Sequence, residues 1–318
     1  VYIGGGTPSV FGGKRLAVLL KTLKKRVRLD HYAEITVEVN PESVDKPLLR
    51  TLKKAGVNRI SMGVQSADDG QLRRIGRIHD FAAAQRAAEL IRQYCTENLS
   101  VDLMFGLPGQ DLESCLRSVD ALCALQPRHI SCYALKLEEG TPLFLENPPR
   151  ADDDLQADMY LALTRRLEER GFQQYEISNF ARPGFRSRHN SKYWDLSEYL
   201  GFGCAAHSFY NGKRFYYTPD IAAYLGGMQG QRPIVEDADE ISCPAELRVG
   251  EYLMLALRTV DGVDEDAFQA RFHRAFGPFA QRLEPYVKSG HVKREAGRWH
   301  LTPEGFLVSN VIIGDALE

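Results

Sequence analysis

The sequence predicts an α/β fold over its first 180 residues, followed by a smaller helical module at the carboxyl end. Short runs rich in β-branched residues, such as the one at Ile35–Val39, alternate regularly with longer amphipathic stretches, which is the pattern of successive βα units. Residues that typically cap helices stand at the ends of these amphipathic stretches. Either a (β/α) barrel or an open doubly wound sheet fits this order of elements.

The elements can be placed in chain order. Asp45, Asp80 and Asp111 stand at N-cap positions, and Gly56 and Gly171 follow helices as residues that adopt the left-handed conformation easily. Strands are expected at Val1–Ile3, Ile35–Val39, Arg59–Val64, Ser100–Phe105, His129–Leu135 and Gln174–Ser178. Helices are expected at Lys14–Arg28, Lys46–Ala55, Phe81–Tyr94, Leu112–Leu125 and Leu155–Arg170.

The carboxyl end has a different pattern, which predicts a winged-helix-like module. Helices are expected at Ala245–Arg258, Glu265–Phe276 and Phe279–Ser289, a hairpin at Gly290–Leu301 around Ala296 and Gly297, and a last helix at Pro303–Leu317. Residues 245–318 contain nine Lys and Arg against eleven Asp and Glu, a net charge of −2. A packing or lid role is therefore favoured over DNA binding. We expect domains at residues 1–180 and 241–318, joined by a connecting segment at 181–240.

Charge and cysteine content limit the classes of function. The whole chain carries 40 Lys and Arg against 42 Asp and Glu, which gives no electrostatic reason to expect a nucleic-acid or anionic-membrane partner. Its apolar runs are shorter than the ~20 residues that cross a bilayer. None of the six cysteines is arranged as C-x-x-C or C-x-x-x-C, which indicates reduced thiols in a cytosolic protein. They are Cys95, Cys115, Cys123, Cys132, Cys204 and Cys243.

Polar or glycine-rich residues follow four of the expected strands. They are the segments Gly4–Pro8, Glu38–Pro41, Gly63–Ser66 and Asp102–Gln110. In α/β folds the carboxyl ends of the strands carry the chemistry, and glycines allow a ligand to approach the backbone closely. The glycine run has neither the lysine of a P-loop nor the spacing of a dinucleotide fingerprint. Four such ends indicate one binding rim.

These motifs, together with Gly56–Ser66 and Gly76-Arg77-Ile78-His79, occur in the same order as in the HemN/HemW family of radical-SAM proteins, and the chain resembles that family from end to end. The family contains oxygen-independent coproporphyrinogen III oxidases and heme chaperones. The resemblance implies a partial (β/α)6 barrel with S-adenosylmethionine across the strand ends. It also implies a [4Fe–4S] cluster on three cysteines.

The resemblance assigns S-adenosylmethionine contacts position by position. Gly5 and Gly6 match the backbone contact to the methionine amino group, and Glu38 matches a carboxylate on the methionine or cluster side. Charge-assisted pairing suits Arg77 to a carboxylate, and a ribose diol suits Asp102. The full expected set is Gly5, Gly6, Thr7, Glu38, Gln65, Arg77, Asp102, Met104 and Ala134, the last two against the adenine.

The sequence departs from the family in one respect. The C-x-x-x-C-x-x-C loop that follows the family's first strand is absent, and the chain opens on Val1 at what resembles the second strand. We therefore expect a fragment with the first barrel strand missing, no metal ligands of its own, and cluster ligands upstream. As written, the chain is expected neither to build the cluster nor to cleave S-adenosylmethionine.

The segment Arg188–Trp194 distinguishes between members of the family. It resembles the H-N-x-x-Y-W motif of the heme chaperones, which the oxidases lack. The resemblance implies heme binding by His189, Asn190, Tyr193 and Trp194, because imidazole ligates heme iron and flat rings pack on a porphyrin. Arg188 and Lys192 could pair with propionates. His207, in a G-x-G-x-x-A-H-like segment, is a second ligand candidate.

Heme carriage is thus the first hypothesis: a cytoplasmic chaperone, with peripheral membrane association as a variant, that delivers heme to a recipient hemoprotein such as a respiratory enzyme. A homodimer is also expected. The alternative is an enzyme, an oxygen-independent coproporphyrinogen III oxidase that decarboxylates propionates oxidatively. A third hypothesis treats Glu38 and Asp102 as the acid–base pair of a glycosidase-like barrel.

Overall fold

The computed structural model describes residues 1–230, 235–237 and 245–318. The chain folds as two compact units, Val1–His189 and Asn190–Glu318. Each unit is described by itself. The domain bounds expected at residues 180 and 240 stay a prediction, and Cys243 and the expected boundary at residue 241 lie outside the described residues.

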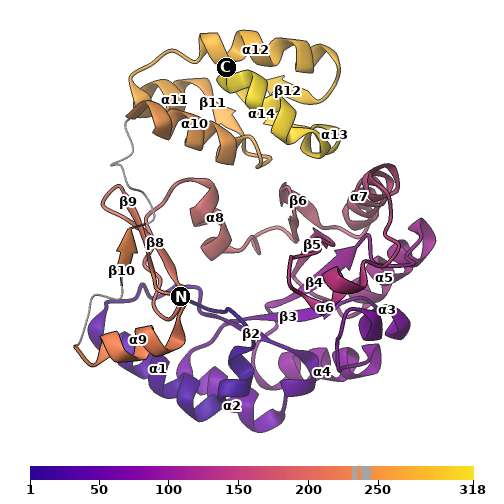
Figure 1. Ribbon diagram of the computed structural model, residues 1–318, viewed down its shortest axis with the longest axis vertical. Coiled ribbons are helices and arrows are strands. Elements are labelled where there is room, and N and C mark those ends of the chain that lie inside the picture. Colours follow the sequence, from indigo (N-terminus) through magenta and orange to yellow (C-terminus); the bar gives the residue numbers. More distant parts are fainter. Residues whose placement is uncertain (231–234, 238–244) are drawn as a thin grey trace. The chain divides into compact units, whose positions relative to one another are not determined.

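A seven-stranded sheet forms the centre of the first unit, in the order β1-β2-β3-β4-β5-β7-β6 (Figure 1). The first five strands are parallel neighbours in chain order, whereas β7 is antiparallel to both β5 and β6. The bounds are β1 Tyr2–Ile3, β2 Thr36–Val39, β3 Arg59–Gln65, β4 Leu99–Phe105, β5 His129–Ala134, β6 Gln173–Glu176 and β7 Asn179–Ala181. The expected α/β class with a partial barrel is confirmed, and the short strand β7 is an addition to it.

Helices connect the parallel strands, and in Figure 1 α1, α2 and α4 lie together on one side of the sheet. The expected caps are confirmed: Asp45, Asp80 and Asp111 each accept from a backbone N–H of the first turn, and Gly56 ends α2 at a φ of 93°. The helices are α1 Gly13–Arg26, α2 Lys46–Ala55, α3 Asp69–Arg74, α4 Phe81–Tyr94, α5 Leu112–Ala124, α6 Pro142–Glu146 and α7 Asp153–Glu169. Two short 3₁₀ turns lie at Pro8–Phe11 and Pro41–Ser43.

The core of the first unit lies between this sheet and its helices. Ile60, Met62 and Val64 of β3 are fully buried, as are Leu99, Val101 and Leu103 of β4. Burial of such side chains contributes about 1.5–3 kcal/mol each. The alternate residues of β3, which are Arg59, Ser61 and Gly63, point the other way and are polar or small, although they too are buried.

Residues 182–189, which we call the returning segment, run from the end of β7 back to the start of β2. The backbone N–H of Arg182 donates to Arg128 O at 2.9 Å, beside β5. Further along, the N–H of Ser187 donates to the Tyr175 hydroxyl at 3.4 Å. At its end, the N–H groups of Arg188 and His189 donate to Glu34, just before β2. The segment thus contacts residues beside β5, in β6 and just before β2.

The second unit contains two small sheets and the expected carboxyl-terminal module. Strand β9 pairs with β8 and β10, and β13 pairs with β11 and β12. The strands are β8 His207–Tyr210, β9 Lys213–Tyr217, β10 Val235–Asp237, β11 Val263–Asp264, β12 Val292–Glu295 and β13 Arg298–Leu301. The helices are α9 Ile221–Met228, α10 Ala245–Ala256, α11 Glu265–Phe272, α12 Gly277–Lys288, α13 Pro303–Leu307 and α14 Ser309–Leu317. Helix α8, Arg188–Trp194, begins in the first unit.

The expected hairpin is confirmed, with Ala296 and Gly297 at φ values of 49° and 79° in its turn. Helices α10 and α12 agree with expectation to within two residues, and two other expected helices differ more. Helix α11 ends at Phe272 because His273 adopts a left-handed conformation at φ 53°, and the last helix divides into α13 and α14 at Val308. Neither change moves a residue expected to bind a ligand.

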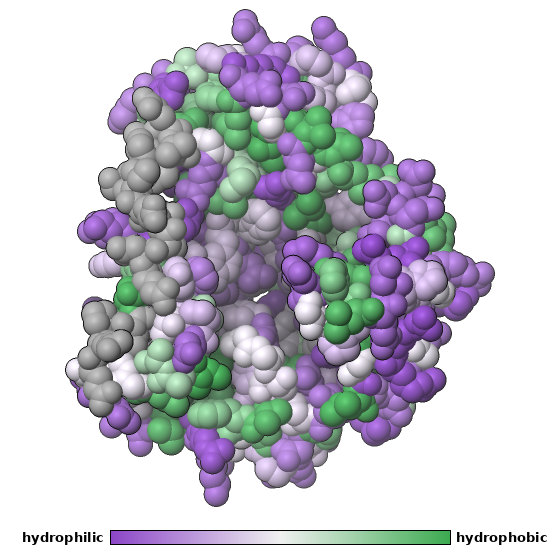
Figure 2. Space-filling view, viewed as in Figure 1, coloured by the Kyte–Doolittle hydropathy of each residue, from purple (hydrophilic) through white to green (hydrophobic). Residues whose placement is uncertain are grey.

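The surface is of mixed polarity. Figure 2 shows hydrophilic residues across the visible face, with apolar patches between them. Within the described ranges, no helix has both the length and the apolar composition that a membrane span requires.

Candidate functional site

The glycine turn after β1 is held by Glu38 of the neighbouring strand β2. The N–H of Gly5 donates to Glu38 Oε2 at 3.1 Å, and the hydroxyl of Tyr2 donates to Glu38 Oε1 at 2.5 Å. Burial and the charge of Glu38 raise the pKa of the Tyr2 phenol, so the hydroxyl keeps the proton that it donates. Gly5 and Gly6 are exposed and adopt left-handed conformations, at φ 83° and 81°. The turn therefore presents its backbone beside a fixed carboxylate.

Gly4 is the point where this cluster packs most tightly. A Cβ at this position would lie 2.5 Å from the Tyr2 ring and 2.8 Å from the Glu38 carboxyl group. A glycine is thus required for Tyr2 and Glu38 to meet. By contrast, no atom lies within 4 Å of the position that a Cβ would take at Gly5 or Gly6. The side of the turn beyond Glu38 is open.

Arg77, in the loop between α3 and α4, joins the ends of three strands. Its Nη2 donates to Gly63 O at 2.6 Å and to Asn40 Oδ1 at 3.2 Å. Asn40 Nδ2 in turn donates to Thr7 Oγ1 at 3.0 Å. The Nε of Arg77 is buried without a hydrogen-bond partner. Burial lowers the pKa of the Arg77 guanidinium, and the acidic groups Glu42 and Asp102 oppose this effect.

Gln65 lies at a bulge where β3 leaves its register with β4, and it adopts a φ of 72°. The bulge turns the strand end towards the Arg77 contacts: a Cβ on Gly63 would lie 2.7 Å from Arg77 Nη2 and 3.0 Å from Gln65 Nε2. Gln65 and Arg77 are therefore brought together, as expected for two contacts to one ligand.

Asp102 occupies the middle of β4, where Gly63 of β3 and Ser131 of β5 lie beside it in register. Burial raises the pKa of its carboxyl group to about 6, and the charge of Glu38 adds to the rise. A hydrogen bond with Ser131 and the charges of Arg59 and Arg77 oppose it. The carboxyl group thus belongs to the same electrostatic cluster as Glu38 and Arg77.

Met104 and Ala134 lie near the carboxyl ends of β4 and β5, which are adjacent strands. Met104 is half-buried and Ala134 is exposed. The structure places both residues on the rim that carries the other expected contacts, and their role against an adenine stays a prediction.

The strand-end residues fit S-adenosylmethionine chemically. A buried guanidinium nitrogen without a partner suits a carboxylate, a fixed carboxylate suits an ammonium group, and Asp102 suits a pair of hydroxyls. The open left-handed turn leaves backbone groups of Gly5 and Gly6 accessible. Gly5, Gly6, Glu38, Gln65, Arg77 and Asp102 are the residues that would hold it.

The described residues do not fit a metal cluster. No group of three or more His, Cys, Asp or Glu side chains among them could hold a metal ion. The five described cysteines are free, and burial raises the pKa of Cys95 to about 11 and that of Cys115 to about 12. Cys95, Cys115 and Cys132 are buried in the core, which supports the interpretation of these three residues as packed thiols.

His189 is held against the first strand of the sheet. Its ring stacks on that of Tyr2, with centroids 4.6 Å apart and planes inclined by 16°. The two oxygens of Glu34 accept from the N–H groups of Arg188 and His189, at 3.1 and 3.2 Å, and Arg188 Nη1 donates to Tyr32 O at 2.7 Å. A carboxylate thus caps the start of α8 and fixes the half-buried His189.

The other expected heme contacts lie in the second unit. Tyr193 is 41% exposed and meets Tyr199 edge to face, with centroids 4.7 Å apart. Asn190 and Trp194 are half-buried on the same helix, α8. The exposed His207 stacks on Tyr216, with centroids 5.0 Å apart. Each unit therefore presents an imidazole packed on a tyrosine ring.

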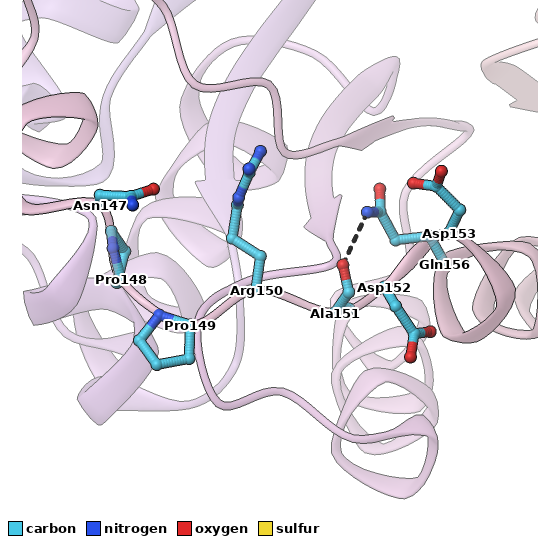
Figure 3. Close-up of a pocket in the computed structure, with 8 residues that line it drawn as sticks. All are labelled: Asn147, Pro148, Pro149, Arg150, Ala151, Asp152, Asp153 and Gln156. Carbon is cyan, nitrogen blue, oxygen red and sulfur yellow. Dashed lines mark hydrogen bonds between the residues drawn. The ribbon is translucent and has the colours of Figure 1, made fainter.

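A polar hollow in the first unit lies apart from the expected residues. It is formed by the loop before α7 and by the first turn of that helix (Figure 3). Gln156 Nε2 donates to Ala151 O at 2.9 Å, and Asp152 caps α7 by accepting from the N–H of Leu155. These contacts account for its polar residues as part of the helix start, so we give the hollow no functional role.

Sequence reasoning did not identify Tyr2, Glu34 or Asn40 as members of the site. Residues two apart on a strand face the same way, so Tyr2 shares a face with Gly4. This alternation along the strand could have indicated that Tyr2 lies beside the glycine turn. Glu34 contacts Arg188 across 154 residues, a distance at which a single sequence carries no signal.

Comparisons with known proteins agree with the geometry. Residues 1–122 match the Radical SAM superfamily, and residues 244–308 match the HemN C-terminal domain. The fold is similar to that of the coproporphyrinogen III oxidase HemN from Escherichia coli, a radical SAM enzyme, with a TM-score of 0.84. That likeness covers 99% of this chain and 76% of the other at 20% identity, and it concerns the fold alone.

Similar sequences include heme chaperones. The heme chaperone HemW of Haemophilus influenzae is 34% identical over 320 residues, covering 98% of this chain and 81% of the relative. The Escherichia coli heme chaperone HemW is 35% identical over 317 residues, covering 98% and 82%. A mitochondrial radical S-adenosyl methionine domain-containing protein 1 from Mus musculus is 42% identical, covering 65% and 48%.

Proposed function

Because the chain belongs to the HemN/HemW family of radical SAM proteins, we propose that it is a heme chaperone, which binds heme and delivers it to a hemoprotein. The observation that carries this proposal is the placement of His189, which Glu34 and Tyr2 hold at the start of α8. Two relatives named as heme chaperones match 98% of the chain, which supports the same function.

The residues around His189 suit heme chemically. An imidazole is a common axial ligand of heme iron, and aromatic rings such as those of Tyr193 and Trp194 offer flat apolar surface to a porphyrin. Arg188 and Lys192 provide cations for its propionates. In this proposal His189 is the principal ligand and His207 is a second candidate.

S-adenosylmethionine and a [4Fe–4S] cluster, the latter on cysteines that this chain does not contain, are the proposed cofactors of the full-length form, in keeping with the radical SAM family. Arg77 and Glu38 would hold the two charged groups of the amino acid moiety, and Asp102 would orient the ribose. When bound together, these groups supply radical chemistry. Here we propose that they control dimerisation or heme transfer instead of porphyrinogen turnover. The proposed partners are a recipient hemoprotein, such as a respiratory enzyme, and a second copy of the chain, in the cytoplasm or peripherally at a membrane.

The test is a titration of hemin into the chain, followed by visible absorption. We expect a Soret shift that saturates near one equivalent and is lost or strongly changed in His189→Ala. His207→Ala tests the second candidate, and His31→Ala, at an exposed histidine beside Tyr32, controls for non-specific binding. Identical titrations of the wild type and His189→Ala would contradict the proposed site, and the absence of any shift would contradict heme carriage.

The alternative function is oxidative decarboxylation of coproporphyrinogen III. The strand-end set of Gly5, Glu38, Arg77 and Asp102 is equally compatible with it, because an oxidase that uses radical chemistry needs the same contacts to S-adenosylmethionine. The chain with a C-x-x-x-C-x-x-C loop restored ahead of β1, loaded with its cluster and incubated with S-adenosylmethionine and coproporphyrinogen III, distinguishes the two. Release of carbon dioxide and formation of the decarboxylated product would support the oxidase. A glycosidase function has no support among the comparisons.

A further inference from the structure

Tyr2 stands between the two sites that the proposed function requires. Its ring stacks on that of His189, with centroids 4.6 Å apart, while its hydroxyl donates to Glu38 Oε1 at 2.5 Å. The other oxygen of Glu38 accepts from the N–H of Gly5 in the open turn. A single side chain thus contacts both the proposed heme ligand and the carboxylate of the proposed cofactor turn.

The packing leaves Tyr2 little freedom to move independently. A Cβ on Gly4 would lie 2.5 Å from its ring and 2.8 Å from the Glu38 carboxyl group, so the three residues fit together only with a glycine at that position. Strand β1 fixes the backbone of Tyr2 through its pairing with Thr36. A change at Glu38 therefore moves or frees the phenol of Tyr2. The ring of Tyr2 in turn packs against the imidazole of His189.

Glu34 also contacts His189, and it binds the backbone and not the ring. The N–H of His189 donates to Glu34 Oε1 at 3.2 Å, and this bond sets the position of the Cα atom. The direction of the imidazole depends on χ angles that the backbone bond does not fix. The stack on Tyr2 restrains those angles, since its planes are inclined by only 16°.

We infer that Tyr2 is a positioning residue that ties the orientation of His189 to the state of Glu38. The inference rests on the proposed heme role of His189 and the proposed cofactor role of Glu38. Whatever engages Glu38 at the glycine turn alters the hydrogen bond to Tyr2, and through the stacked ring it alters how His189 meets iron. By linkage, heme on His189 changes the affinity of the turn for its ligand by the same factor.

The test is a double-mutant cycle in the 318-residue chain, with hemin as the probe. Tyr2→Phe keeps the ring and removes the hydroxyl, whereas Glu38→Gln keeps the shape and removes the charge. Each variant is expected to bind hemin about tenfold more weakly and with an altered Soret maximum, as when a hydrogen bond to a charged group is lost. The double variant should be no weaker than either single one, because both remove the same link. Tyr32→Phe, at a tyrosine that is 79% exposed, is the matched control and should bind like the wild type.

The outcomes separate this inference from the proposed function. If His189→Ala loses hemin while Tyr2→Phe and Glu38→Gln titrate like the wild type, the chaperone proposal stands and the positioning role is overturned. Strictly additive losses in the double variant would also overturn it, because Tyr2 and Glu38 would then act separately. If His189→Ala binds like the wild type, the proposed heme site fails and the inference fails with it. Both the Soret maximum and the midpoint of the hemin titration are measured. A merely structural role of Tyr2 would lower the fraction of folded protein but leave the spectrum of bound heme unchanged.

Discussion

The Nη2 atom of Arg77 lies 2.6 Å from the carbonyl oxygen of Gly63, so a cation carried by a loop is fixed near the carboxyl end of strand β3. The same atom donates to Asn40, which donates onward to Thr7. One side chain thereby joins the ends of β1, β2 and β3. The Nε atom of Arg77 is buried without a hydrogen-bond partner.

Replacement of this guanidinium is expected to weaken the binding of S-adenosylmethionine. In Arg77→Lys a single nitrogen replaces the planar guanidinium, so an ammonium group that stays on Gly63 and Asn40 cannot also occupy the position of Nε and pair there with a ligand carboxylate. We therefore expect affinity to fall by a factor of ten or more. Isothermal titration calorimetry measures it. Arg117→Lys is the matched control, since Arg117 pairs with Glu113 on the exposed surface of α5. Equal affinities in the wild type and Arg77→Lys would exclude Arg77 from the cofactor site.

Addition of one methyl group at Gly4 is expected to destabilise the first unit. The Cβ of Gly4→Ala would stand 2.5 Å from the Tyr2 ring and 2.8 Å from the Glu38 carboxyl group, so one of them must move. We expect a loss of about 1–3 kcal/mol in the free energy of unfolding, measured by urea denaturation. Gly277→Ala, where no atom lies within 4 Å of the new Cβ, should change it by less than about 0.5 kcal/mol. A Gly4→Ala variant as stable as Gly277→Ala would show that the cluster tolerates displacement.

Glu176 predicts a pH dependence of stability. It is fully buried between β6 and β7, where burial raises its pKa from the ordinary 4.5 to about 7, against hydrogen bonds from Ser178 and Asn179. Between these two values the folded chain holds a proton that the unfolded chain has released. Stability from this group is therefore present below pH 4.5 and is lost as the pH rises to about 7.

Glu176→Gln tests this dependence. Between pH 5 and pH 8 the free energy of unfolding of the wild type should fall by an amount on the order of 3 kcal/mol because of this group. In the variant this fall should be absent. Urea denaturation at both pH values measures the difference, and Glu113→Gln, at an exposed carboxylate, is the control. A parallel pH profile in the wild type and Glu176→Gln would mean that Glu176 is ionised in the folded state.

The cysteines predict a graded reactivity with thiol reagents. Cys95, Cys115 and Cys132 are buried, and burial raises their pKa values, so they should react only after unfolding. Cys204 is half-exposed, with its sulfur near the carbonyl oxygens of Thr218 and Pro219, and it should react first. An Ellman titration in a Cys243→Ser background confines the count to described cysteines. Loss of the fast-reacting thiol in Cys204→Ser would identify Cys204 as the residue that reacts first. An unchanged fast reaction would contradict that assignment.

Local signals predicted the elements of the first unit well. Asp45, Asp80 and Asp111 act as caps because capping depends on residues three positions apart, which a single sequence displays. The strand ends at Gly5, Glu38, Gln65 and Asp102 could be predicted to share a rim because parallel strands align their carboxyl ends.

Contacts made over long separations could not be predicted. The three-residue strand β7 carries too few residues for a periodic pattern, and it is defined by its pairing with β5 and β6. The bonds of Glu34 to Arg188 and His189 depend on the path of the returning segment, for which the sequence offers no local signal. The contact of Tyr2 with His189 could not be predicted for the same reason, since His189 is the last residue of the first unit in the sequence.

The returning segment also has a consequence for the order of folding. The bond between the N–H of His189 and Glu34 closes a loop of 155 residues, which contains every strand from β2 to β7. Contacts of such separation form late, because the entropy of closing the loop is recovered only after the intervening strands have paired. We therefore expect His189 to reach its place against Tyr2 late in folding, so that a partly folded chain, or one still emerging from the ribosome, does not present the imidazole in this setting.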